Sequence, residues 1–345
     1  MKLLNTLHGS THETPPCWMM RQAGRYLPEY RELRAEAGDF LTLSYTPKYA
    51  TEVTLQPLRR FAFDAAILFS DILVIPHALG MSLRFEAGEG PVLGRASTLQ
   101  EFSNYFKVSK ETYHQHLDPV YKAVSSIRES LDDDKTLIGF CGAPWTVAAY
   151  MTDAKPSKSI DNLKTWAFQN PSLWAEEMLN LARISADYLS KQVEAGAEVL
   201  QIFDSWAASV PAVLFEDAVM NPLQEMCRLL KEKHPETPII LFPRGVDSRT
   251  LEMMIERFGD LFDGLGVDYS TPLEHVAHLQ KHITLQGNMD PMVLMTDPET
   301  VKAHVEDTLL KVDPTQRYIF NIGHGVTPKT PIENVQAMVE AVQGK

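Results

Sequence analysis

The sequence predicts a single-domain α/β protein, a (β/α)8 TIM barrel that spans residues 1–345 and carries long loops at the carboxyl ends of its strands. Eight short apolar runs occur along the chain, and longer amphipathic stretches separate them. The runs are apolar throughout rather than alternating, which is typical of strands buried on both faces of a parallel sheet. They cover residues 17–20, 65–70, 136–141, 198–203, 238–242, 264–267, 282–286 and 318–322.

The stretches between the runs show the spacing of helices. Residues 171–195 form the clearest pattern, and a second helix is expected over residues 113–131. Eight strand–helix units favour a closed barrel. A doubly wound open sheet stays as the alternative, because the closure of a sheet cannot be read from the sequence.

Two connections are longer than a strand–helix unit needs. Residues 72–135 contain four glycines and Pro91 before the expected helix, which indicates a mobile loop or a hairpin. The polar segment 155–158, Lys-Pro-Ser-Lys, follows Tyr150 and is expected to fold over a site. Long loops in compact domains are commonly lids or partner surfaces.

The charge balance limits the kind of partner. The chain has 32 Lys and Arg against 45 Asp and Glu, a net charge of −13, which argues against a nucleic-acid or anionic-membrane surface. An anionic substrate therefore requires a local basic site. Arg21, Arg25, Arg31 and Arg34 supply such a cluster.

The cysteines and the N-terminus predict a cytoplasmic protein. Cys17, Cys141 and Cys227 are odd in number and never paired as CxxC, which suits a reducing compartment. The polar N-terminus lacks the layout of a signal peptide, and no apolar run approaches the ~18 residues of a membrane span.

Polar residues follow the apolar runs at the points where a barrel collects its active-site residues. Their clustering can also reflect the general polarity of loops, which explains Asp268 and Asn288 well enough. It explains the arginine pair and the glycine-flanked histidine less well. The residues in question are Arg21 and Arg25, Asp71, Tyr150, Asp204 and Ser205, Arg244, Asp268, Asn288 and Asp290, and His324.

Arg21 and Arg25 are the most informative of these residues. They stand four positions apart in a short loop with Gly24 between them. Each guanidinium offers a planar, permanently charged fork of donors, so the pair is suited to clamp a carboxylate or phosphate. The alternative is a pair of solvated surface arginines.

Three further residues are candidates with open alternatives. Asp71 lies between two apolar stretches and is either a helix cap or a buried acceptor of N–H groups, where its charge would stabilise a nearby cation. His324 stands between Gly323 and Gly325 and either binds a carboxylate or sits in a turn. Tyr150, placed on a loop, either donates to a ligand or packs in the core.

Other chemistries find less support. His275, His278 and His282 have helical spacing, but no cysteine or acid completes a metal site at a strand end. No P-loop, complete GxGxxG or GxSxG motif occurs, and no lysine directly follows any of the apolar runs.

Six ordered blocks resemble the uroporphyrinogen decarboxylase family. They are the arginine loop at 17–31, Phe-Ser-Asp-Ile-Leu at 69–73, Gly-Phe-Cys-Gly-Ala-Pro-Trp-Thr at 139–146, Gln-Ile-Phe-Asp-Ser-Trp-Ala at 201–207, Leu-Gln-Gly-Asn-Met-Asp-Pro at 285–291 and Asn-Ile-Gly-His-Gly-Val at 321–326. The resemblance implies a homodimeric barrel that needs no cofactor or metal. Its substrate would be uroporphyrinogen III, whose four acetate side chains lose CO₂ to give coproporphyrinogen III in haem biosynthesis.

The resemblance also implies roles for individual residues. Asp71 and Arg21 match catalytic positions, Asp71 by accepting the pyrrole N–H groups at the centre of the macrocycle. The residues that match substrate-binding positions are Arg21, Gln22, Ala23, Gly24, Arg25, Asp71, Tyr150, Phe203, Ser205 and His324. Ala208 stands where the family pattern has glycine, which leaves the shape of that loop open.

Two rival hypotheses remain from the sequence. A corrinoid-linked, zinc-dependent methyltransferase shares the barrel, but it needs thiolate and imidazole ligands at strand ends. A non-catalytic porphyrinogen-binding protein would keep the arginines and could lose Asp71, which is present here.

Overall fold

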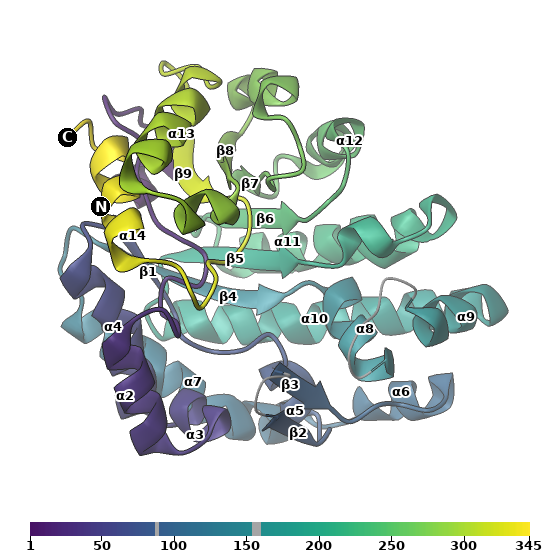
Figure 1. Ribbon diagram of the computed structural model, residues 1–345. Coiled ribbons are helices and arrows are strands. Elements are labelled where there is room, and N and C mark those ends of the chain that lie inside the picture. Colours follow the sequence, from purple (N-terminus) through teal and green to yellow (C-terminus); the bar gives the residue numbers. More distant parts are fainter. Residues whose placement is uncertain (87–89, 154–159) are drawn as a thin grey trace.

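Seven parallel strands form one curled sheet in the computed structural model, which describes residues 1–86, 90–153 and 160–345 (Figure 1). The predicted α/β barrel class is confirmed. Along the sheet the order is β1-β4-β5-β6-β7-β8-β9. The strands are β1 (Ala65–Ile67), β4 (Thr136–Gly142), β5 (Val199–Asp204), β6 (Ile239–Pro243), β7 (Gly264–Gly266), β8 (Thr284–Met289) and β9 (Tyr318–Ile322).

A hydrogen bond inside the sheet shows that it is curled. Gln201 on β5 and Gln286 on β8 are both buried, and Nε2 of Gln286 donates to Oε1 of Gln201 over 3.1 Å. Strands three places apart in a flat sheet would be about 14 Å apart at the usual spacing. Trp18 adds to the same contact, because its Nε1 donates to Oε1 of Gln286 over 2.8 Å. The open, doubly wound alternative is therefore excluded.

The first apolar run closes the barrel with one residue instead of a strand. Cys17 makes a parallel bridge to Phe320 of β9, whose backbone N–H donates to the Pro16 carbonyl over 2.9 Å. On the other side, the Asp64 N–H donates to the Cys17 carbonyl over 2.8 Å, just before β1. The prediction of a strand over residues 17–20 was wrong beyond Cys17, since the Met20 N–H donates to the side-chain oxygen of Asn321 on β9 instead of a backbone carbonyl of that strand.

Helices surround the sheet, and the two predicted most clearly are present. The helix expected over residues 171–195 is α10 (Pro171–Glu194), and the one expected over 113–131 is α7 (Lys110–Ser130). The others are α1 (Lys2–Leu7), α2 (Pro28–Ala37), α3 (Phe40–Tyr45), α4 (Pro47–Arg60), α5 (Val74–Ala78), α6 (Leu99–Tyr105), α8 (Pro144–Asp153), α9 (Asp161–Gln169), α11 (Asn221–Lys233), α12 (Ser248–Phe258), α13 (Pro298–Leu310) and α14 (Ile332–Val342). In the described residues no helix has the length and apolar character needed to cross a membrane.

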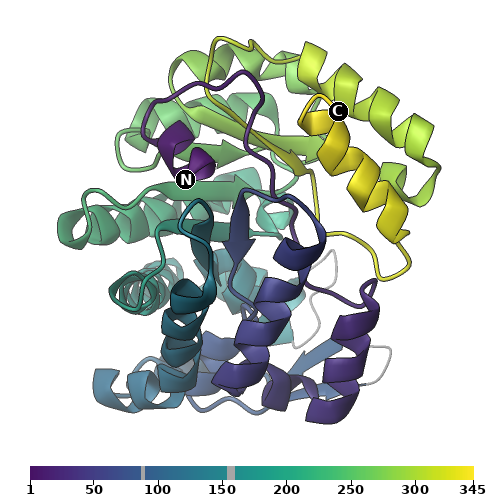
Figure 2. The ribbon, with the colours of Figure 1, turned by 90° about the vertical axis from the view of Figure 1, so that its left-hand side faces the viewer.

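Both termini lie on the side of the barrel that faces the viewer in Figure 2, where the N-terminus, beside α1, and the C-terminus, after α14, stand well apart. The chain enters the sheet at Cys17, between its first and last strands, and after β9 it returns to this side through α14.

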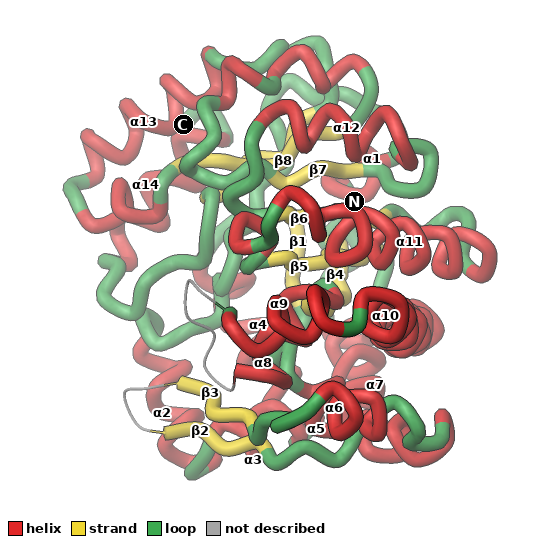
Figure 3. The backbone as a smooth tube through the Cα atoms, turned by 90° about the vertical axis from the view of Figure 1, so that its right-hand side faces the viewer, coloured by secondary structure: helices red, strands yellow, loops and turns green. Residues whose placement is uncertain are grey.

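The long connection between β1 and β4 contains the predicted hairpin. Strands β2 (Leu83–Glu86) and β3 (Gly90–Leu93) pair antiparallel, and the hairpin stands apart from the main sheet beside α5 and α6 (Figure 3). The segment 155–158, expected to cover the site, lies outside the described residues.

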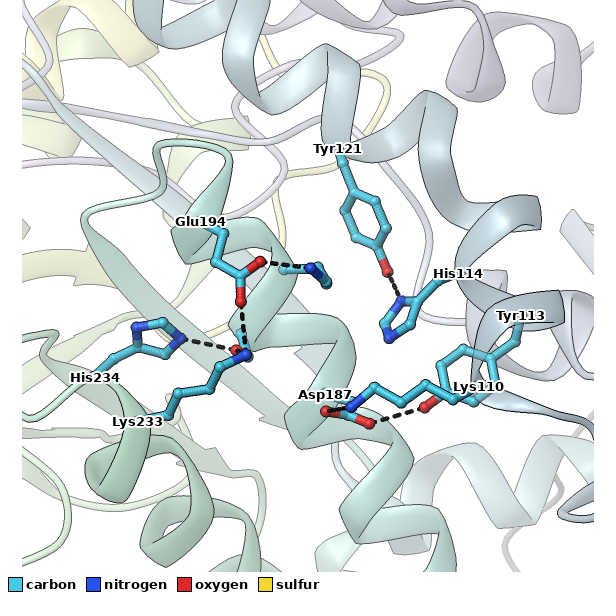
Figure 4. A network of polar contacts seen from close by, with 10 residues as sticks. Lys110, Tyr113, His114, Tyr121, Asp187, Glu194, Lys233 and His234 are labelled. Carbon is cyan, nitrogen blue, oxygen red and sulfur yellow. Dashed lines mark hydrogen bonds and ion pairs between the residues drawn. The ribbon is translucent and has the colours of Figure 1, made fainter.

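Charged contacts join helices on the outside of the barrel (Figure 4). Asp187 on α10 accepts from Lys110 Nζ over 2.5 Å and from the Tyr113 hydroxyl over 2.9 Å, both on α7. Glu194, also on α10, accepts from Lys233 Nζ of α11 over 2.6 Å. Partly exposed ion pairs of this kind stabilise a fold only modestly. They hold the outer helices and contain none of the residues predicted for the site.

Candidate active site

Arg21 reaches the carboxyl end of the barrel from a tight turn. The turn begins where the Gln22 N–H donates to the Met19 carbonyl over 3.0 Å, and Arg21 itself has a φ of +60°, which is rare outside glycine. Its aliphatic stem lies directly on Gly325, where any added Cβ would stand 2.7 Å from Arg21 Cγ. The glycine thus leaves room for the arginine, and the loop after β9 fixes the direction of the guanidinium.

The rest of the arginine loop divides into inward and outward residues. The side chain of Gln22 is fully buried, and its Nε2 donates to the Ala65 carbonyl of β1 over 3.2 Å. Ala23 and Gly24 are half-buried, whereas Arg25 is exposed. Arg31 donates to the Arg25 carbonyl over 2.8 Å, which braces the loop. Gln22 therefore anchors the loop with its side chain, and Arg25 keeps its guanidinium in solvent.

Asp71 follows β1 and leads into α5. Its Oδ1 accepts the Leu73 N–H over 2.8 Å, while the side chain stays partly open to solvent. Burial raises the pKa of Asp71, and the charge of Arg21 acts in the opposite direction. From the sequence, Asp71 was either a helix cap or a buried acceptor of N–H groups. Asp71 does hold the turn before α5, and the residue as a whole is half-buried.

Tyr150 lies beside these two residues, but on a helix instead of the predicted loop. Pro144 starts α8, because proline fits the first helical turn, and Tyr150 follows on the next turns. Burial raises the pKa of Tyr150; its phenol also interacts with the side chain of Trp206 and with the charges of Asp71 and Arg21. The three residues that sequence reasoning took from three separate strand ends therefore share one site.

His324 joins the site from the loop after β9. Burial lowers the pKa of His324 to about 4, and the charges of Arg244 and Arg21 act in the same direction. The residue after it, Gly325, lies directly against the side chain of Arg21, so His324 stands next to the point where the arginine passes this loop. The imidazole is neutral at physiological pH and offers one N–H donor.

Phe203 and Ser205 stand at the end of β5. Phe203 is half-exposed and meets Phe140 and Phe242 edge to face, with ring centroids 5.8 and 6.0 Å apart. Ser205 is half-buried two residues later. An aromatic wall and a hydroxyl thus border the strand end, and within the described residues neither hydrogen-bonds to Asp71.

The site includes residues to which the sequence gave no role. Arg244, after β6, acts on His324 and donates to the Tyr269 hydroxyl over 3.5 Å. Asp268 is buried and accepts from the Ser270 N–H over 2.8 Å and from the Gly245 N–H, so it ties together the loops after β6 and β7. Position after a strand end was the signal for both residues, but it did not distinguish the arginine that acts on His324 from the aspartate that holds the loops together.

The cysteines have the character of core residues. Cys17, Cys141 and Cys227 are free and buried, and burial raises the pKa of each thiol. A raised pKa opposes the thiolate that zinc requires. In the described part of the chain, no group of three or more His, Cys, Asp or Glu side chains is arranged to hold a metal ion.

Comparisons with known proteins agree with this architecture. A methyltransferase from Methanosarcina mazei has a similar fold, with a TM-score of 0.82 over 99% of this chain and 97% of that one at 21% sequence identity. A B12-independent methionine synthase from Shewanella sp. W3-18-1 is more distant, with a TM-score of 0.53 over 96% of this chain and 98% of that one at 10% identity.

Two curated relatives are much more similar in sequence. The uroporphyrinogen decarboxylase of Chelativorans sp. (strain BNC1) is 44% identical over 99% of this chain and 98% of its own length. That of Mesorhizobium japonicum is 45% identical over 99% of this chain and 97% of its own length. The family described as Uroporphyrinogen decarboxylase (URO-D) matches residues 1–344. The chain therefore belongs to the uroporphyrinogen decarboxylase family.

Proposed function

We propose that this protein is a uroporphyrinogen decarboxylase, a carboxy-lyase that removes CO₂ from the four acetate side chains of uroporphyrinogen III and releases coproporphyrinogen III in porphyrin and haem biosynthesis. Full-length similarity to curated decarboxylases supports the activity. The observation that carries the proposal is that Arg21 and Asp71 lie close enough for the charge of Arg21 to lower the pKa of Asp71, and for both charges to act on the pKa of Tyr150.

Decarboxylation of a pyrrole acetate needs a place for the electrons that CO₂ leaves behind. Protonation of the ring carbon next to the nitrogen makes an iminium-like cation, which accepts them without a cofactor. Asp71 stabilises that cation through the pyrrole N–H groups, and the low local dielectric strengthens this interaction. Arg21 lowers the pKa of Asp71 against the effect of burial, which favours the carboxylate this role requires.

Arginines hold the acidic substituents of the substrate. Arg21 and Arg25 bind acetate and propionate carboxylates, and Arg21, or a water that it orients, supplies the proton. Gln22 and Gly24 support binding without a charged side chain. Gln22 anchors the loop through its side chain on β1, and Gly24 lets the backbone come close to the substrate.

Side chains from other strand ends complete the binding site. Tyr150 and Ser205 donate hydrogen bonds to the substrate, and Phe203 covers one face of the macrocycle. His324 contributes a neutral N–H donor, which its lowered pKa supports. Ala23 lines the loop between the two arginines, where it is half-buried.

The protein acts in the cytoplasm as a homodimer. Three free, buried thiols support a reducing compartment, and membership of the family supports the dimer. Sedimentation velocity at several protein concentrations tests the dimer, and a single monomeric species throughout would reject it.

The experiment that tests the function is anaerobic incubation of metal-stripped protein with uroporphyrinogen III, followed by oxidation and chromatographic counting of carboxylates. Stepwise conversion from eight carboxylates to four supports a decarboxylase that needs no metal. An unchanged eight-carboxylate compound from folded protein would reject it. Methyl transfer that appears when zinc is added back to this protein would favour the rival hypothesis, which the raised thiol pKa values disfavour.

A further inference from the structure

Asp204, the last residue of β5, is buried and has one carboxylate oxygen without a partner. It is 1% exposed, and its Oδ1 accepts the Thr146 hydroxyl over 2.5 Å. No group in the described part of the chain hydrogen-bonds to Oδ2. A buried, half-satisfied carboxylate costs free energy, so its presence beside Phe203 and Ser205 calls for a physical reason.

Thr146 transmits this contact to the next loop. Its hydroxyl donates to Asp204 and accepts the Trp206 backbone N–H over 3.0 Å. One side chain of α8 therefore holds the residue before Ser205 and the residue after it. Thr146 is fully buried, which protects both bonds from competition with water.

A second set of contacts reinforces the same junction. Trp145 Nε1 donates to the Trp206 carbonyl over 3.2 Å and to Ser209 Oγ over 3.1 Å, and Ser209 Oγ donates to the same carbonyl over 2.6 Å. One turn further along α8, the Tyr150 phenol interacts with the side chain of Trp206. The N-terminal half of α8 and residues 204–209 are therefore bound at several points.

We propose that Asp204 is a positioning residue, which acts through Thr146 to hold Tyr150 on α8 and Ser205 after β5 in one fixed arrangement toward the substrate. The proposal rests on the proposed function, because it assigns Tyr150 and Ser205 to the substrate. The bond to Oδ1 is what the junction needs, and Asp204 itself does not touch the ligand. Small displacements of binding groups are costly, since about 1 Å of misplacement lowers a rate by up to about a hundredfold.

Paired variants test the proposal. Thr146→Val and Asp204→Leu remove the bond, whereas Thr146→Ser and Asp204→Asn retain a donor and an acceptor. We expect the first pair to raise KM and lower kcat/KM by about tenfold or more, and the second pair to stay within about threefold of wild type. Thr152→Val is the matched control, because Thr152 is a buried threonine of the same helix whose hydroxyl, among the described residues, bonds only to Ala148, Ala149 and Asp153.

Hydrogen exchange at the Trp206 amide provides a readout that does not depend on activity. Thr146→Val is expected to lose protection there, while Thr152→Val keeps it. If Thr146→Val and Asp204→Leu match Thr152→Val in KM and in exchange, the positioning role is wrong. A different outcome is that exchange changes as expected but the wild-type protein does not decarboxylate uroporphyrinogen III. In that case the contacts between α8 and residues 204–209 are supported, whereas the proposed function and the role of Asp204 toward the substrate are rejected.

Discussion

The side chain of Arg21 crosses Gly325 so closely that any side chain at position 325 would displace it. An added Cβ would stand 2.7 Å from both Cγ and Nε of the arginine. The two residues are 304 positions apart in the chain, yet the loop after β9 sets the direction of the arginine that precedes β1. Gly325 thus serves the arginine as much as the histidine, whereas Gly323 lies against Tyr269.

The first prediction concerns this contact. Gly325→Ala should lower kcat/KM by about ten- to a hundredfold, because the methyl group displaces the guanidinium from the substrate. The contact acts only through Arg21, so the double variant with Arg21→Ala should be no worse than Arg21→Ala alone. Steady-state kinetics of the three proteins measures this double-mutant cycle, and additive losses would contradict the explanation.

Asp71→Asn should lower kcat by about a hundredfold or more while the protein stays folded. The amide keeps an oxygen for the Leu73 N–H but loses the charge that stabilises the developing cation. Arg31→Ala is the comparison, since Arg31 donates to backbone carbonyls of the loop and contacts no reacting group in this mechanism. Turnover of Asp71→Asn near the wild-type rate would reject the role of the carboxylate.

Asp204 should make stability fall as the pH rises. Burial raises the pKa of Asp204 to about 7, although the Thr146 hydroxyl and the Trp206 N–H favour the carboxylate. Between pH 4 and 7 the folded state therefore holds a proton that the unfolded state has released, and the free energy of unfolding declines across this window. The loss is at most about 4 kcal/mol, at about 1.4 kcal/mol per pKa unit.

The measurement is urea unfolding of wild type and Asp204→Asn at pH values from 4 to 8. The amide does not titrate, so the difference between the two proteins should shift in favour of the variant as the pH rises. A difference that is constant with pH would show that Asp204 titrates normally in the folded protein.

His324 should make the free energy of unfolding rise with pH, the opposite of the effect of Asp204. Its pKa is lowered to about 4 in the folded protein, so below about pH 6.5 the unfolded state binds a proton that the folded state does not. Stability is then complete above pH 6.5 and is lost as the pH falls toward 4, by at most about 3 kcal/mol. His324→Gln should lack this loss in the same unfolding series. An NMR titration of the imidazole with a midpoint near 6.5 would overturn it.

The sequence predicted the strand ends better than the site itself. Arg21, Asp71 and His324 were predicted to meet because parallel strands in a barrel end at a common face, and the charge of Arg21 does act on both of the others. Tyr150 was predicted at the same face, but the prediction that it lies on a loop was wrong, since Pro144 starts a helix that includes it. Gln22 was assigned to the substrate, whereas its side chain bonds to β1, a direction that residue order does not encode.

Local pattern determined the class of fold, the order of its strands and helices, and the residues that follow each strand. These depend on apolar periodicity and on residues within a few positions of one another. The tertiary structure alone decided the closure of the barrel by Cys17, the contact of Arg21 with Gly325 and the bond from Thr146 to Asp204. Each joins segments that are about 60 to 300 residues apart. Such contacts form only when the whole sheet has curled and buried its core, because no short segment gains enough from them to offset its loss of conformational entropy.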